Sequence, residues 1–137
     1  MSAVDYFLEG NSCSESVVLN AIESGYCDKS LLPSATPFSG GMSSGCVCGT
    51  VSGSMLVIGH LYGKNNSYGN PPIAKQLAKE FMEKFIEAHK VTCCRVLTRG
   101  FEFASPERKN HCTNLVEFSS NLLEDILKKA SDSVKNG

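Results

Sequence analysis

Apolar residues recur every three or four positions along this chain, and no stretch alternates apolar and polar residues one by one. A spacing of three or four places side chains on one face of a helix, whereas a strand needs a period of two. The pattern is clearest for Ile73, Leu77, Phe81 and Phe85. The sequence therefore predicts an all-α fold: a single-domain helical bundle of about four principal helices joined by short helical turns.

Start and stop signals bound the first and third of these helices. Ser12 and Glu15 form a capping-box pattern, and Gly25 supplies a stop, so we expect a helix between them. Two prolines at 71–72 favour the first turn of another helix, which the apolar spacing extends to Ala88.

The last helix has two candidate starts. Ser105 followed by Pro106 is a strong start signal, and a restart at Asn110 is the alternative. Either start places one set of mostly apolar residues on a single face: Cys112, Leu115, Val116, Ser119, Leu122, Leu123, Ile126 and Leu127.

Shorter segments separate the long helices. Residues 28–32 can form a short helix, and residues 34–45 have the proline, glycine and serine content of a loop. Residues 63–70 are expected to form a polar loop. Residues 92–97 are expected to make one or two helical turns, capped by Thr92.

The second long helix is expected to begin near Gly45 or Cys46 and to end about Tyr62. Gly45, Gly49 and Gly53 recur every fourth residue, which makes a smooth stripe where another backbone can approach. Each glycine in a helix costs about 1 kcal/mol relative to alanine, so close packing must offset the loss. We therefore expect this helix to be the most buried, packed within one chain or across a homodimer.

Length and charge exclude several classes of protein. A chain of 137 residues suits one domain, over 1–137. With a net charge of −1, the chain lacks the excess of basic residues expected of a nucleic-acid binder. Residues 47–62 are too short and too rich in glycine to span a membrane, and the first residues do not resemble a signal peptide. We expect a cytoplasmic protein with neither nucleic acid nor membrane as a partner.

Seven cysteines are the main chemical feature, and four of them fall where helices or helical turns are expected to open. These four are Cys13, Cys48, Cys94 and Cys112. A helix N-terminus stabilises an anion, and the thiolate is both the nucleophile and the metal ligand. We therefore expect at least one of the last three to have a thiol pKa below the usual value of about 8.5.

The cysteine spacing matches no compact motif. Cys-x-x-Cys is absent, as are the ferredoxin spacings. Any site must therefore be assembled from distant segments, with the four sulfurs meeting in one place. Cys27 reads as a core residue outside that group, and Cys46 and Cys93 are expected nearby but pointing elsewhere. Arg95 either stabilises a neighbouring thiolate or pairs with a surface carboxylate.

Several segments together resemble a known family. They are residues 11–17, the Gly40-Gly41-Met42 run, residues 48–59, Tyr62-Gly63, residues 81–85, residues 94–97 and Cys112. This combination is similar to that of the bacterial and archaeal C_GCAxxG_C_C proteins, a redox-active family, with Thr50 where alanine is common. The resemblance implies that Cys13, Cys48, Cys94 and Cys112 are the family's cysteines. A similar domain occurs beside haem-binding sequence in split-Soret-type cytochromes, which favours an iron–sulfur cluster.

Two function classes remain open at the level of sequence. The first is a redox protein whose four cysteines catalyse thiol–disulfide chemistry or ligate an iron–sulfur cluster, acting with a redox partner protein. The second is a structural module, with zinc on the same four cysteines or with no metal, that docks on a partner. The sequence does not choose between them.

Overall fold

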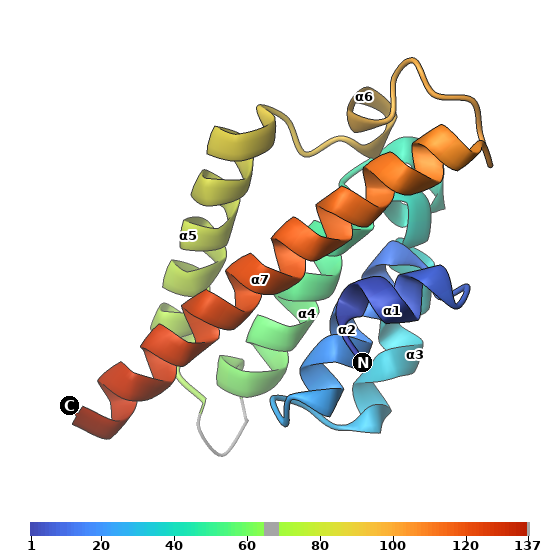
Figure 1. The fold of residues 1–137 in the computed structure, drawn as a ribbon. Coiled ribbons are helices and arrows are strands. Elements are labelled where there is room, and N and C mark those ends of the chain that lie inside the picture. The colour runs from blue at the N-terminus through green and yellow to red at the C-terminus, as the bar shows by residue number, and fades with distance from the viewer. Residues whose placement is uncertain (65–68, 137) are drawn as a thin grey trace.

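The computed structural model describes residues 1–64 and 69–136, with side chains as far as residue 132. Within these residues the chain is helical and has no strand, so the all-α prediction is confirmed (Figure 1). The helices are α1 (Ala3–Leu8), α2 (Cys13–Glu23), α3 (Leu32–Ala35), α4 (Gly49–Tyr62), α5 (Pro71–His89), α6 (Cys94–Leu97) and α7 (Pro106–Asn136). The four long ones match the four predicted. The expected loop over 63–70 lies partly outside the described residues.

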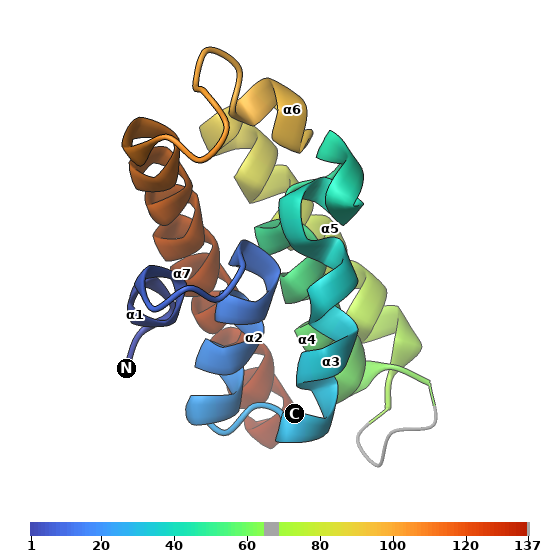
Figure 2. The ribbon, with the colours of Figure 1, turned by 90° about the vertical axis from the view of Figure 1, so that its right-hand side faces the viewer.

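The long helix α7 runs the length of the molecule, with α5 on one side of it and α1 and α2 on the other (Figure 1). The central helix α4 packs against α2, α5 and α7 (Figure 2). At one end of the bundle, the short helix α6 lies near the beginning of α7. The first turns of several helices therefore gather at that end.

Helix α2 begins as its capping box predicts. Ser12 Oγ accepts from the Glu15 N–H, and the Glu15 carboxylate accepts from the Ser12 N–H. The apolar face buries Val17 and Val18 against the core. This exact start sets where the first turn of α2 meets α4.

Helix α4 begins later than the sequence indicates. It starts at Gly49, and the expectation of a start near Gly45 or Cys46 is wrong. The chain before it has left-handed backbone at Gly40 to Ser43 and again at Gly45, with φ between +57° and +73° at these positions. Left-handed residues cannot continue a right-handed helix, so α4 starts only after this turn.

Close contact between α2 and α4 explains two of the three glycines in α4, Gly49 and Gly53. A Cβ on Gly53 would lie 2.9 Å from Ser14 O and 3.2 Å from Ser14 Cα. Ser14 is itself buried and donates its hydroxyl to Ala35 O at 2.7 Å. Gly59, by contrast, is exposed and has no atom within 4 Å of such a Cβ. Only part of α4 therefore needs glycine for packing.

The segment 34–45, expected to be a loop, is a succession of helical turns. The end of α3 is followed by a 3₁₀ turn at Thr36–Phe38 and a π-type turn at Gly41–Gly45. Pro33 and Pro37 occupy first-turn positions, where a missing N–H costs nothing. The prolines therefore start turns here rather than preventing them.

The remaining long helices meet in an aromatic core. Phe81 and Phe85 of α5 are fully buried, and Phe118 of α7 contacts Phe85 edge-on with ring centroids 6.2 Å apart. Helix α7 runs unbroken from Pro106, with Ser105 Oγ accepting from the Arg108 N–H at 3.1 Å. Of the two starts considered, the first is the observed one.

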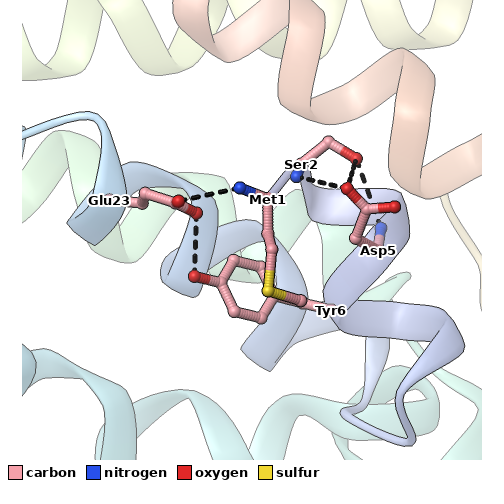
Figure 3. A network of polar contacts seen from close by, with 5 residues as sticks. All are labelled: Met1, Ser2, Asp5, Tyr6 and Glu23. Atoms are coloured by element: carbon pink, nitrogen blue, oxygen red, sulfur yellow. Dashed lines mark hydrogen bonds and ion pairs between the residues drawn. The ribbon is translucent and has the colours of Figure 1, made fainter.

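Helix α1 was not anticipated from the sequence. It is capped by Ser2 and Asp5, whose side chains bond each other's backbone N–H groups. Figure 3 shows how it is tied to α2: the Met1 amine and the Tyr6 hydroxyl both contact the Glu23 carboxylate at 2.8 Å. Buried Ala3 and Phe7 then pack on Val116 of α7. Helix α1 thus bridges α2 and α7.

Candidate functional site

A cavity of about 1360 Å³ lies at the end of the bundle where α2, α4 and α6 begin. Four of its lining residues are Cys13, Cys48, Cys94 and Cys112. These come from four helices spread over a hundred residues of sequence. The fold therefore brings the four cysteines of interest to one cavity, although only three of them lie at the start of a helix, two as its first residue and Cys48 directly before it.

The four cysteines differ in their place on the helices. Cys13 and Cys94 are the first residues of α2 and α6, and Cys48 is the residue that precedes α4. Cys112 is wrongly predicted to open a helix, because α7 starts at Pro106 and carries this residue in its second turn. Cys48 and Cys94 are buried, with 5% and 8% of their surface exposed, whereas Cys13 and Cys112 are half-buried.

A single β-bridge joins the segments that carry Cys48 and Cys94. Val47 and Cys93 pair in antiparallel fashion. The Cys48 N–H donates to Thr92 O at 2.7 Å, and the Cys94 N–H donates to Cys46 O at 2.5 Å. These bonds use the N–H groups at the start of α4 and α6. The expectation that Thr92 caps α6 is wrong, since the preceding residue is Cys93 and it makes no side-chain cap.

Two glycines allow the backbone to close around the sulfurs. A Cβ on Gly49 would lie 2.5 Å from Cys13 Sγ, so the α4 backbone touches this thiol directly. A Cβ on Gly41, whose φ is +69°, would lie 2.8 Å from Cys94 Cβ. The glycine turn therefore packs against Cys94.

Burial dominates the electrostatics of the thiols. It raises the pKa of Cys48 to about 12, with a smaller contribution from the neighbouring Cys13 and an opposing one from Thr50, whose Oγ1 lies 3.1 Å from Cys48 Sγ. Burial also raises the pKa of Cys94 and of Cys112. The expected lowering of a thiol pKa is wrong for all three, because desolvation of the thiolate outweighs stabilisation at a helix terminus.

Cys13 is the common neighbour of the other three thiols. Its charge raises the pKa of Cys48, of Cys94 and of Cys112, and in each case it is the largest thiol contribution. Cys13 and Cys112 also pack against the same apolar group, Ala3, Phe7 and Val116. The arrangement is therefore centred on Cys13.

Two cations of α7 complete the site, and sequence reasoning missed both. The charge of Arg108 lowers the pKa of Cys94 and of Cys112 against the effect of burial. Lys109 donates to Phe7 O at 3.0 Å and sits 3.6 Å from the centroid of the Phe7 ring. The signal was their spacing: they precede Cys112 by four and three residues, which puts all three on neighbouring positions of a helix.

The remaining cysteines do not line this cavity. Cys27 packs at the edge of the main core, where burial raises its pKa to about 11. Cys46 is exposed, and the Cys93 thiol donates to Gly45 O at 3.2 Å. Arg95 fits neither expected role, since its Nη2 donates to Ser44 O at 3.0 Å.

The arrangement does not match a four-cysteine metal centre. In the part of the chain that the structure describes, no three side chains of His, Cys, Asp or Glu are grouped so as to hold a metal ion. Over the same residues, no helix is both long and apolar enough to cross a membrane.

Comparison with known proteins gives one match. A family model described as "Putative redox-active protein (C_GCAxxG_C_C)" matches residues 11–126, which include all four cavity cysteines. No curated protein and no solved structure matches the chain. Because the matched region covers most of its length, the chain belongs to the C_GCAxxG_C_C family of redox-active proteins.

Proposed function

We propose that Cys13, Cys48, Cys94 and Cys112 form a thiol–disulfide centre that exchanges electrons in pairs. The observation that carries this proposal is the shared cavity in which Cys13 interacts with each of the other three thiols. Thiol exchange requires that an attacking sulfur and its resolving sulfur be neighbours. Cys13 and Cys112, which pack against the same apolar group, are the pair we propose to meet that requirement first.

Cys13 and Cys112 are the pair that meets an external oxidant first. Both are half-buried and both contact the same small apolar group, whereas Cys48 and Cys94 are buried. Access governs which thiol reacts, together with its thiolate fraction. The two buried thiols then act as a second pair, which the Cys13–Cys112 disulfide can oxidise by internal exchange. One buried thiolate attacks Cys13 and Cys112 leaves as a thiolate; the other buried thiol then attacks the mixed disulfide, forms the Cys48–Cys94 bond and releases Cys13.

Reduction of an external disulfide takes two exchange steps. One thiolate attacks an external disulfide, a protein–substrate disulfide forms, and one substrate thiolate leaves. The second protein thiol attacks that mixed disulfide, forms the Cys13–Cys112 bond and releases the second substrate thiolate. Two electrons pass from the protein to the substrate, and the two thiol protons end on the two leaving sulfurs.

Disulfide mapping tests the proposal. The protein is purified without oxygen, reduced, equilibrated with glutathione redox buffers, alkylated and analysed by mass spectrometry. We expect loss of two thiols and a Cys13–Cys112 disulfide before any other. Cys27→Ser is the matched control, because it removes a thiol outside the cavity and should leave this disulfide unchanged.

Two results would contradict the proposal. Cavity thiols that stay reduced in every buffer would show that they do not exchange. Charge-transfer bands in the visible spectrum, with iron and labile sulfide in the fresh protein, would show instead that the same cysteines hold a cluster.

A reducing compartment such as the cytoplasm suits the seven free thiols, all of which lie in described residues.

A further inference from the structure

We infer that the cavity selects an anionic disulfide of low molecular weight as its substrate. This inference rests on the proposed thiol–disulfide function and names the chemical class on which it acts. The observation behind it is the charge of the cavity wall, which the distribution of charge in the whole chain does not predict.

The cavity wall is positively charged. Among the described residues that line it are Arg95, Arg99, Arg108 and Lys109, and none of the lining residues is aspartate or glutamate. The chain as a whole has 14 acidic and 13 basic residues. The wall thus carries a formal charge of about +4 in a protein of net charge −1, so cations are concentrated where the four thiols lie.

These cations are not neutralised by carboxylates. Within the described residues, the four ion pairs involve the N-terminal amine or lysines of α5 and α7 that lie away from the cavity. Arg95 and Lys109 instead donate to backbone carbonyls, and Arg108 lies over the Phe103 ring. The positive potential is therefore available to a ligand.

The wall also offers neutral hydrogen-bond donors. The Ser44 hydroxyl lines the wall beside the cations, as does the Asn11 amide, which has a second N–H besides the one donated to Tyr6 O at 2.9 Å. The volume of about 1360 Å³ exceeds that of ordinary small-molecule pockets, about 300–1,000 Å³, and so admits a peptide-sized ligand. Carboxylates on such a ligand can pair with arginine in bidentate fashion.

The same charges assist the chemical step. When a protein thiolate attacks the substrate disulfide, negative charge develops on the departing sulfur. Arg108 lines the same cavity as Cys94 and Cys112 and its charge acts on both thiols, so a cation lies near the sulfurs where charge moves. Fixed charges of this kind stabilise a developing anion without reorganising. The electron count is that given above, with the anionic disulfide as the oxidant.

The test compares three small disulfides that differ in charge and share the same reactive bond. They are dithiodipropionate, bis(2-hydroxyethyl) disulfide and cystamine, with formal charges of −2, 0 and +2. The rate of oxidation of the reduced protein by each is divided by the rate for 2-mercaptoethanol, which removes intrinsic reactivity. We expect the normalised rate of the dianion to exceed that of the dication at least tenfold at low salt. The ratio should fall towards one in 0.5 M salt.

Charge variants locate the effect. Arg99 is exposed and does not contact the thiols, so Arg99→Gln removes one wall charge. At about 10 Å in water, the loss of one unit charge should lower the ratio of dianion to neutral rates two- to fourfold. Arg99→Glu should lower it further. Lys75→Gln, an exposed position on α5 outside the cavity, is the matched control and should keep the wild-type ratio.

The outcomes separate this inference from the proposed function. If none of the three disulfides oxidises the cavity thiols, the thiol–disulfide function itself fails. If all three react at equal normalised rates, or if cystamine is fastest, the function stands and the anionic selectivity is overturned. Equal ratios in wild type, Arg99→Glu and Lys75→Gln would likewise overturn it, because the wall charge would then have no effect.

Discussion

Cys48 lies where two opposing effects meet. Its place before α4 favours the thiolate, and its burial disfavours it; burial prevails and raises the pKa to about 12. Among the four cavity thiols, we expect iodoacetamide to modify Cys13 and Cys112 first, with Cys48 slowest and still rising in rate up to pH 10. Residue-resolved mass spectrometry measures the order, and an inflection for Cys48 near pH 8.5 would contradict it.

Arg108 is the side chain that moderates two of these thiols. Because the Arg108 charge lowers the pKa of Cys94 and Cys112, the substitution Arg108→Gln should raise both pKa values. It should therefore slow the alkylation of both thiols at pH 8. Arg99→Gln removes the same charge from the cavity wall without a thiol contact and serves as the control. An equal change in both variants would mean that general charge, and not contact, sets the reactivity.

At the scale of the element, the α2–α4 contact makes one glycine indispensable and leaves another replaceable. Gly53→Leu should destabilise the protein by about 1–3 kcal/mol or more, since the new side chain meets the Ser14 backbone. Gly53→Ala should also destabilise it. Gly59→Ala, in the same helix but in open space, should be neutral or stabilise by up to about 1 kcal/mol. Urea denaturation measures all three, and a neutral Gly53→Leu would refute close packing there.

Local signals predicted the elements that local contacts make. The capping box at Ser12 and the Ser105-Pro106 signal at the start of α7 set those starts correctly, because the bonds that form them span three residues. The start of α4 was misplaced, since it depends on left-handed backbone before Cys46 and on pairing of Val47 with Cys93. A pattern within a few residues of sequence cannot predict a contact between two segments so far apart in the chain.

The candidate site likewise has features that the sequence predicts and features that only the fold determines. Helix-start signals and family resemblance pointed to the four cysteines, and the fold brings them to one cavity. Their thiol pKa was misjudged because burial is a property of the folded molecule. Arg108 was missed because its partner Cys94 lies on another helix, although its spacing from Cys112 is visible in the chain.

At the scale of the whole molecule, buried thiols make stability depend on pH. The pKa of Cys48 is about 12 and that of Cys27 about 11, both above the unfolded value of about 8.5. Between these values the folded chain keeps protons that the unfolded chain releases. The contribution of these two thiols to the stability of the folded state is therefore complete below about pH 8.5 and is lost as pH rises through 11 and 12.

We thus expect the free energy of unfolding to decrease from pH 8 to pH 10.5. Urea denaturation under reducing conditions measures the slope. Replacing both Cys27 and Cys48 with alanine should flatten it, while tyrosine and lysine titrate alike in both proteins. An unchanged slope would assign the alkaline loss to those other groups.

The Val47–Cys93 pairing determines how fast Cys94 can be exposed as well as where α6 lies. A helix of four residues does not hold itself together, so α6 is kept in place by the Cys94 N–H bond to Cys46 and by His111 Nε2, which donates to Leu97 O at 2.8 Å. Opening these few bonds exposes Cys94 while the aromatic core stays intact. An oxidant that cannot enter the cavity reaches the buried thiols only after that opening. The opening rate of the Val47–Cys93 bridge therefore limits their oxidation, whereas the half-buried thiols react faster.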